Sequence, residues 1–98
     1  MTDLRKLAAG RPCQVRYPGI CNHDSSTTVL AHIRLPGITG TALKAPDALG
    51  AWCCSSCHDF ADARVPRSGY TKEQQLTLFY EGVLRTQAQL IKEGKIRW

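Results

Sequence analysis

The sequence lacks any long hydrophobic run, because its uninterrupted apolar stretches span only a few residues. A membrane-spanning helix needs about 20 successive apolar residues, so no transmembrane segment is expected. The first ten residues, MTDLRKLAAG, also lack the apolar core of a secretory signal peptide. Internal repeats and low-complexity tracts are absent as well. We therefore expect a cytoplasmic protein with no membrane partner.

Acidic residues are scarce relative to basic ones. The chain has 13 Lys and Arg against 8 Asp and Glu, which gives a formal net charge of +5 and a pI near 9.2. This balance favours an anionic partner, with nucleic acid the commonest. The 98 residues, 43% of them apolar, are enough for a single domain over residues 1–98 with a modest core. A core of this size gains noticeably from a metal or from disulfides.

Short extended and helical patterns alternate along the chain. The segment VLAHIRL alternates apolar and polar residues and predicts a strand whose His32 and Arg34 share a face. A Gly- and Pro-rich segment follows and predicts a long loop. The expected elements are a helical turn within residues 3–9, strands over 29–35 and 50–53, and a helix over 58–64.

The pattern for a long C-terminal helix is the clearest in the sequence. Thr71 and Gln74 form a capping box, and Gly94 suits the position just after the helix. Seven apolar residues recur at helical spacing and predict a packing face: Leu76, Phe79, Tyr80, Val83, Leu84, Leu90 and Ile91. The pattern leaves the oligomeric state open.

Three cysteines and a histidine lie within the segment CCSSCH, residues 53–58. The run CSSCH matches a c-type haem attachment motif, but no export signal is present and the only methionine is Met1, so no haem is expected. A thioredoxin-like redox pair needs a βαβ context that the chain has no room for. Buried free thiols are the remaining simple explanation.

A structural zinc site fits these cysteines better. Zinc takes four soft ligands in tetrahedral geometry, commonly from two short cysteine loops. Cys54 and Cys57 form a CxxC pair, and Cys13 and Cys21 bracket the turn-forming segment Tyr-Pro-Gly. The seven residues between Cys13 and Cys21 exceed the usual two to four. We expect these four to bind Zn²⁺ and Cys53 to pack inward, with the choice between Cys53 and Cys54 left open.

The order of a strand histidine, a loop, a second strand and CxxCH opening a helix resembles the HNH (ββα-metal) nuclease motif over residues 13–62. The resemblance implies an α+β fold with a small zinc-stapled ββα-metal core and a long C-terminal helix. It also implies that His32 is the general base and that His58 binds a catalytic divalent metal, Mg²⁺ or Mn²⁺. The upstream cysteine pair would join the CxxC pair at the structural zinc.

The likeness extends to the YbcO family of small lambdoid-prophage proteins, which are regarded as nucleases. It is carried by DLRK at 3–6, CQVR at 13–16, PGIC at 18–21, VLAHIRL at 29–35, CSSCH at 54–58 and the late LRTQAQLIKEGKI segment. Nearly the whole chain is covered. The resemblance implies a phage-encoded or bacterial HNH-type endonuclease, a hydrolase that cuts phosphodiester bonds in DNA.

Two positions depart from the HNH pattern. Ala31 stands where many HNH enzymes carry a metal ligand, and the orienting Asn is missing, with Asp47 the nearest candidate for that role. Asp62 follows His58 by four residues and can share its helix face, so the two could bind one divalent ion together. His23, in a polar loop, is expected to be a surface residue.

Nucleic-acid contacts are assigned to basic residues near the motif. Arg34 has a guanidinium that suits a phosphate, and Arg16 and Lys44 are further candidates. The alternative function is a zinc-stabilised nucleic-acid-binding module without cleavage activity, which the missing ligand at Ala31 favours. A third alternative is a protein-interaction adaptor that uses the C-terminal helix.

Overall fold

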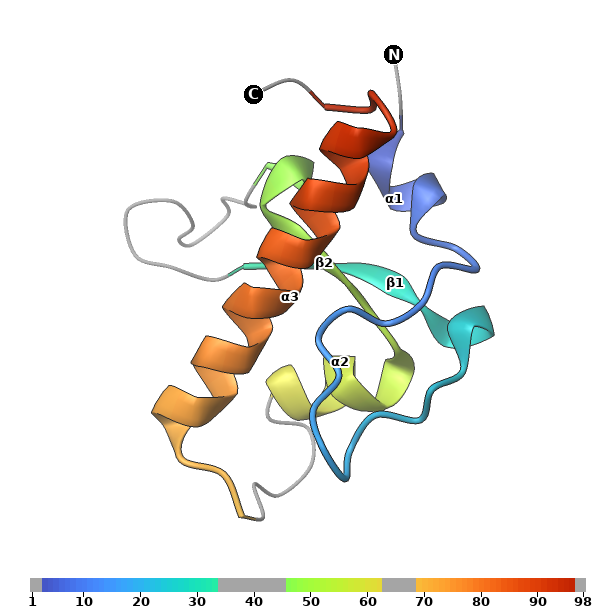
Figure 1. The fold of residues 1–98 in the computed structure, drawn as a ribbon. Coiled ribbons are helices and arrows are strands. Elements are labelled where there is room, and N and C mark those ends of the chain that lie inside the picture. Colours follow the sequence, from blue (N-terminus) through green and yellow to red (C-terminus); the bar gives the residue numbers. More distant parts are fainter. Residues whose placement is uncertain (1–2, 34–45, 63–68, 97–98) are drawn as a thin grey trace.

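The computed structural model describes residues 3–33, 46–62 and 69–96, and it has an α+β architecture (Figure 1). A two-stranded antiparallel sheet packs against a long C-terminal helix, and a short helix follows the second strand. The expected α+β class with a long last helix is therefore confirmed. The helices are α1 (Leu4–Leu7), α2 (Ser55–Ala61) and α3 (Lys72–Lys92), the strands are β1 (Val29–His32) and β2 (Gly50–Cys53), and the 3₁₀ turns are η1 (Ser25–Thr27) and η2 (Asp47–Leu49).

The sheet pairs β1 with β2 in an antiparallel register that places Leu30 opposite Trp52 and His32 opposite Gly50. The sequence predicted β1 to run to residue 35, but the strand ends at His32. The backbone N–H of Ile33 still donates to the carbonyl of Leu49 at 3.0 Å, so backbone pairing continues one residue beyond the strand. The rest of the predicted range lies outside the described residues. The bounds predicted for β2 are those observed.

The outer edge of β2 is fastened to two other segments. The N–H of Trp52 donates to the hydroxyl of Thr86 on α3 at 3.0 Å, and its carbonyl accepts from the N–H of Gln14 at 2.8 Å. The Thr86 hydroxyl in turn donates to the carbonyl of Gly82 at 2.8 Å. These bonds satisfy backbone groups that an edge strand would otherwise leave unpaired. They fix α3 across the strand that leads into the cysteine cluster.

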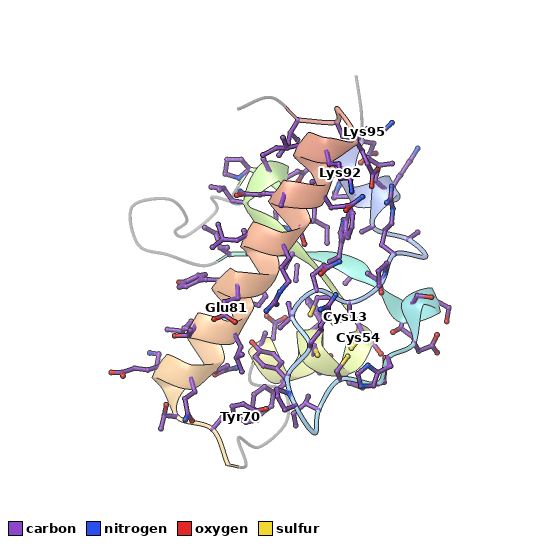
Figure 2. All side chains as sticks on the ribbon, in the orientation of Figure 1. Cys13, Cys54, Tyr70, Glu81, Lys92 and Lys95 are labelled. Atoms are coloured by element: carbon purple, nitrogen blue, oxygen red, sulfur yellow. The ribbon has the colours of Figure 1, made fainter. Side chains whose placement is uncertain are left out.

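Helix α3 begins and ends where the sequence predicts. The Thr71 hydroxyl accepts from the Gln74 N–H, and the Gln74 side chain accepts from the Thr71 N–H, which completes the capping box. At the other end Gly94 has a φ of 72°, and the N–H of Lys95 donates to the carbonyl of Leu90, as in a Schellman motif. Tyr70 precedes the helix at one end, and Lys92 and Lys95 lie at the other (Figure 2).

The predicted packing face of α3 is wrong at two positions. Leu84 is 64% exposed and Leu76 is 38% exposed. The buried residues follow a different stripe that includes polar and small side chains: Gln75, Phe79, Gly82, Val83, Thr86 and Leu90. The reason is that Thr86 bonds to β2, which rotates this stripe toward the sheet and turns Leu84 outward. Gly82 belongs to the stripe because a Cβ there would lie 2.9 Å from the Cα of Val15.

Helix α2 begins three residues earlier than predicted, at Ser55 instead of His58. Cys54 is its N-cap, and the sulfur of Cys54 accepts a hydrogen bond from the N–H of Cys57 at 3.4 Å. The usual N-cap residues are Ser, Thr, Asp and Asn, so a capping cysteine was not recognised in the sequence. The helix ends at Ala61, with Asp62 as its C-cap.

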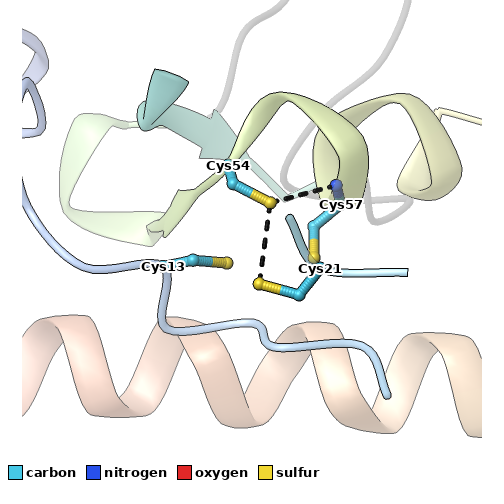
Figure 3. A group of neighbouring side chains, drawn as sticks. All are labelled: Cys13, Cys21, Cys54 and Cys57. Atoms are coloured by element: carbon cyan, nitrogen blue, oxygen red, sulfur yellow. Dashed lines mark hydrogen bonds between the residues drawn. The ribbon is translucent and has the colours of Figure 1, made fainter. Parts of the chain in front are cut away.

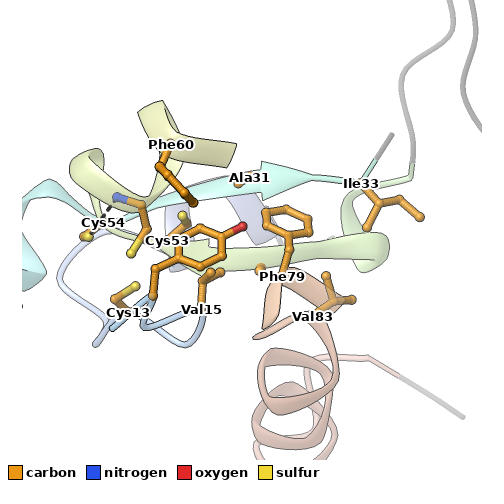
Figure 4. Close-up of a cluster of buried hydrophobic side chains, with 12 residues drawn as sticks. Cys13, Val15, Ala31, Ile33, Cys53, Cys54, Phe60, Phe79 and Val83 are labelled. Carbon is orange, nitrogen blue, oxygen red and sulfur yellow. Dashed lines mark hydrogen bonds between the residues drawn. The ribbon is translucent and has the colours of Figure 1, made fainter. Parts of the chain in front are cut away.

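Aromatic side chains pack between α2 and α3, next to the cysteines (Figure 4). The ring of the fully buried Tyr17 meets Phe60 edge-on with centroids 5.0 Å apart and Tyr70 at 6.0 Å. The Tyr17 hydroxyl donates to the carbonyl of Gln75, whose side-chain amide donates to the carbonyl of Phe60 at 2.7 Å. Buried Gln75 therefore links the last turn of α2 to the first turns of α3.

A second buried cluster joins α1 to the sheet and to the end of α3, through Ala8, Leu30, Trp52 and Leu90. Arg11 lies over the Trp52 ring, 4.8 Å from its centroid, and its guanidinium forms two 2.7 Å hydrogen bonds to the Glu93 carboxylate. These contacts tie the N-terminal segment to the last turn of α3. Within the described residues, no helix has both the length and the apolar character needed to cross a membrane.

Candidate functional site

Four cysteine sulfurs converge on one point between the N-terminal segment and the start of α2 (Figure 3). Cys13 and Cys21 come from the segment between α1 and η1, Cys54 caps α2, and Cys57 lies in its first turn. The four sulfur atoms lie within 4.8 Å of one another, and those of Cys21 and Cys54 are 3.7 Å apart. None of the cysteines forms a disulfide.

This geometry fits a tetrahedral metal ion. A Zn–S bond is about 2.3 Å long, so four sulfurs around one zinc lie about 3.8 Å apart. The Cys21–Cys54 separation already has this value, and the other pairs need to move by about 1 Å or less. All four ligand atoms are thiols, the donor type that soft metals prefer. The four cysteines could therefore hold a metal ion.

Two backbone turns of the same kind present sulfurs to this centre. The Cys57 N–H donates to the sulfur of Cys54, three residues earlier, and the Arg16 N–H donates to the sulfur of Cys13 with the same spacing, both at 3.4 Å. Arg16 adopts a left-handed φ of 54° to close its turn. The turn at Cys13 explains how a pair with seven intervening residues converges, because Cys13 is positioned by residues 13–16 and not by the segment leading to Cys21.

The side chain of Arg16 supports that turn. Its Nε donates to the Cys13 carbonyl at 3.0 Å, and its terminal nitrogen donates to the Gln14 side chain at 3.1 Å. The residue remains exposed, so the predicted contact with nucleic acid stays a prediction. The other two predicted contacts, Arg34 and Lys44, lie outside the described residues.

Cys53 is not one of the four converging sulfurs, although its thiol contacts those of Cys13 and Cys57. It is fully buried in the aromatic core, and Cys54 supplies the fourth converging sulfur. A hydrogen bond with Cys13 and burial raise the pKa of the Cys53 thiol, and a hydrogen bond with Cys57 opposes this shift. The contact with Cys53, followed by one with Cys57, lowers the pKa of the Cys13 thiol. Cys13 is thus the sulfur whose thiolate form the neighbouring thiols stabilise.

His32 and Asp47 form a close pair where β1 ends and η2 begins. His32 is the last residue of β1, Asp47 is the first of η2, and His32 Nε2 lies 2.7 Å from Asp47 Oδ1. A carboxylate accepts hydrogen bonds, so this contact places the imidazole proton on Nε2 and leaves the lone pair on Nδ1. About a quarter of the His32 side chain is exposed. The arrangement is that of an oriented imidazole with one basic nitrogen.

His58 and Asp62 lie one helical turn apart on the same face of α2. His58 Nε2 is 3.6 Å from Asp62 Oδ2, and the Asp62 side chain is 15% exposed. An imidazole nitrogen and a carboxylate oxygen at this separation can both reach a divalent ion. The third histidine, His23, is exposed as predicted, and its Nδ1 lies 3.7 Å from the sulfur of Cys21.

A pocket of about 220 Å³ is lined by one member of each histidine–aspartate pair, His32 and Asp62. It is lined by Tyr17, Ala31, His32, Ala61, Asp62, Lys72, Gln75, Leu76, Phe79 and Tyr80. His32 and Asp62 thus face one cavity, although 30 residues separate them. Sequence reasoning missed the wall formed by Lys72 and Tyr80 of α3, because Tyr80 was assigned only to the packing face and Lys72 was not singled out.

Comparison with known proteins gives a consistent result. The sequence profile of the family described as "Putative nuclease YbcO" matches residues 2–95. Proteins named "Putative nuclease YbcO" from Escherichia coli K12 and "Putative nuclease ybcO" from Enterobacteria phage 82 are each 52% identical over 99 residues, which cover 99% of both chains. A solved structure titled "Structure of a putative bacteriophage protein from Escherichia coli str. K-12 substr. MG1655" superposes with a TM-score of 0.76 at 42% identity, covering 94% of this chain and 100% of that one. The chain belongs to the YbcO family.

Proposed function

We propose that the protein is a metal-dependent endonuclease of the HNH type that hydrolyses phosphodiester bonds in DNA. The observation that carries the proposal is the paired His32 and Asp47, 2.7 Å apart, beside a pocket that Asp62 also lines. The candidate base and one candidate metal ligand thus line the same cavity, and the base is paired with a carboxylate. The net charge of +5 supports an anionic polymer as the substrate.

His32 acts as the general base. Asp47 accepts the Nε2–H and holds the ring, so Nδ1 is available to take a proton from the attacking water. The same carboxylate stabilises the imidazolium that forms after proton transfer, because it lies within hydrogen-bonding distance of it. An imidazole suits this role because it can accept a proton at one nitrogen while the other is held by a hydrogen bond.

His58 and Asp62 would hold the catalytic divalent ion, Mg²⁺ or Mn²⁺. When bound, the ion supplies positive charge that stabilises the phosphate and the leaving oxygen as negative charge develops there. The 3.6 Å separation of His58 Nε2 and Asp62 Oδ2 lets both side chains serve one ion. The remaining coordination positions are those that water and the DNA phosphate fill in such sites.

The four-cysteine centre is assigned a structural role, with zinc as its metal. It joins the N-terminal segment to the cap of α2, and α2 carries His58 and Asp62. Cys13, Cys21, Cys54 and Cys57 would supply all four ligands of a tetrahedral zinc, which is typical of structural and not of catalytic sites.

A second candidate is a nucleic-acid-binding module that does not cut DNA. The observation that favours it is Ala31, which lines the pocket beside His32 with a side chain that has no ligand atom. The β1 strand would then supply no ligand to the divalent ion from the position before His32.

Incubation of the purified, zinc-loaded protein with supercoiled plasmid and with branched DNA separates the two functions. The endonuclease account expects nicked or linear products with Mg²⁺ or Mn²⁺ and none without a divalent ion. DNA binding without products in any divalent metal would favour the binding module.

A further inference from the structure

We propose that the pocket beside His32 receives one unstacked base of a single-stranded or locally unpaired stretch of DNA, with Lys72 contacting an adjacent phosphate. This inference rests on the proposed function and specifies its substrate, because His32, the assigned base, lines the same pocket. It assigns a role to three residues of α3 that the cleavage reaction itself does not use: Lys72, Leu76 and Tyr80.

The three α3 residues form one wall of the pocket. Lys72, Leu76 and Tyr80 are spaced four residues apart, so they lie on one face of α3, near its N-terminal end. Opposite them are His32 at the end of β1 and Asp62 at the end of α2. A group that enters the pocket therefore lies between the assigned catalytic residues and this helix wall.

The size and chemistry of the pocket suit a single base. Its volume of about 220 Å³ is below the 300–1,000 Å³ of drug-sized ligand sites, so it holds one ring system and not a larger ligand. Leu76 is 38% exposed and Tyr80 is half-buried, which leaves apolar and aromatic surface open to solvent at the wall. Aromatic rings stack on every type of base, and the exposed ammonium of Lys72 matches a backbone phosphate.

A base can reach this concave site only after it leaves the helical stack. In a duplex, that movement sacrifices pairing and stacking, whereas an unpaired base makes no such sacrifice. The pocket therefore favours single strands, loops and branch points over intact duplex, and it tolerates different sequences because stacking does not depend on base identity.

Fluorescence anisotropy tests the assignment without added Mg²⁺ or Mn²⁺, so the readout is independent of cleavage. The probes are a labelled single-stranded oligonucleotide, a blunt-ended duplex of two complementary strands without a loop and of similar charge, and the same single strand with abasic positions. The proteins are wild type, Tyr80→Ala, Tyr80→Phe and the control Leu84→Ala, which alters an exposed residue of α3 outside the pocket. Circular dichroism and zinc content establish that each variant is folded.

Tyr80→Ala should weaken binding of the single strand by roughly 5- to 150-fold, the range for losing one stacked base. Tyr80→Phe keeps the ring and should bind like wild type, as should Leu84→Ala. The abasic strand should bind weakly to all four proteins and show little effect of Tyr80→Ala. Equal affinity of Tyr80→Ala and wild type for the single strand, or equal weakening for the single strand and the blunt duplex, would overturn the inference even if wild type cuts DNA. If wild type cuts nothing but the Tyr80 effect is found, the cleavage proposal fails and the base pocket stands.

Discussion

His32 Nε2 lies 2.7 Å from Asp47 Oδ1, although 15 residues separate them in the chain. The pairing depends on the sheet, because β1 ends at His32 and η2 leads directly into β2, the strand beside it. The backbone hydrogen bond from Ile33 to Leu49 holds the end of β1 next to η2, just beyond the last paired residue of the strand. The position of Asp47 thus follows from the fold.

Substitutions at Asp47 should separate positioning from chemistry. Asp47→Ala removes the acceptor for Nε2–H and should lower kcat with little change in KM, because the ring loses its orientation while the DNA contacts remain. Asp47→Asn keeps an oxygen that can accept the same hydrogen bond but loses the negative charge that stabilises the imidazolium, so it should recover only part of kcat. Steady-state cleavage of a fluorogenic oligonucleotide measures both constants. Equal loss in Asp47→Asn and Asp47→Ala would show that the carboxylate charge, and not orientation, is what matters.

The cysteine centre predicts a sharp contrast between adjacent residues. Cys54→Ser or Cys57→Ser should lower both zinc content and folded yield, because structural zinc contributes on the order of 10 kcal/mol in small domains. Cys53→Ala leaves all four converging sulfurs in place and should retain one zinc per chain, with a smaller loss of stability from the cavity in the core. Elemental analysis and circular dichroism give the two readouts. Loss of zinc in Cys53→Ala, or normal folding of zinc-free wild type, would contradict the assignment.

Gly82 should resist even the smallest side chain. A Cβ at this position would lie 2.8–3.0 Å from Val15, including its backbone atoms, so helix and loop must separate. Gly82→Ala should destabilise the protein by about 1–3 kcal/mol despite the better helix propensity of alanine. Urea unfolding measures this change, and Leu84→Ala on the exposed face is the control expected to change stability by about 0.5 kcal/mol or less. A more stable Gly82→Ala protein would show that α3 does not pack this closely.

The ion pair between Arg11 and Glu93 predicts a pH-dependent contribution to stability. Hydrogen bonds from Arg11, and then from Gln89, hold the pKa of the Glu93 carboxyl at about 2, below its ordinary value of 4.5. A depressed pKa in the folded state stabilises the fold above pH 4.5, and this contribution disappears as the pH falls from 4.5 toward 2. Glu93→Gln should therefore be less stable than wild type at pH 7.

The difference between Glu93→Gln and wild type should shrink as the pH falls below 4.5. Urea unfolding of both proteins from pH 7 to pH 3 measures it, and comparison of the two proteins at each pH cancels acid effects common to both. Glu81→Gln is the matched control, because Glu81 makes a single exposed contact to Arg85 at 3.4 Å. A difference that stays constant over the whole range would contradict the assignment.

Local signals in the sequence located several parts of the fold. The capping box at Thr71 and the glycine at position 94 fixed both ends of α3, since each acts within a single turn. The bounds of β2 also agree with the prediction. The convergence of the four cysteines was predicted from the CxxC pair, because the sequence argued against haem attachment and against a redox pair.

Features that depend on contacts between distant segments were not predictable. Leu84 is exposed because Thr86, and not an apolar residue, faces β2 and accepts a hydrogen bond from it. A polar residue on the buried face cannot be recognised from the spacing of apolar residues. The start of α2 depends on a sulfur cap, and the turn at Cys13 depends on a left-handed Arg16. The wall of Lys72 and Tyr80 opposite His32 is set by how α3 crosses the sheet.

The most direct test of the account is plasmid cleavage by His32→Ala, with His23→Asn as the control. His23 is an exposed histidine outside the pocket with a φ of 55°, a conformation that asparagine tolerates. Both variants should keep zinc, fold and DNA binding. His32→Ala should lose about 10²–10⁴-fold in cleavage rate, without rescue by excess Mn²⁺, whereas His23→Asn should cut like wild type. A wild-type protein that cuts DNA no faster than His32→Ala would contradict the proposed mechanism.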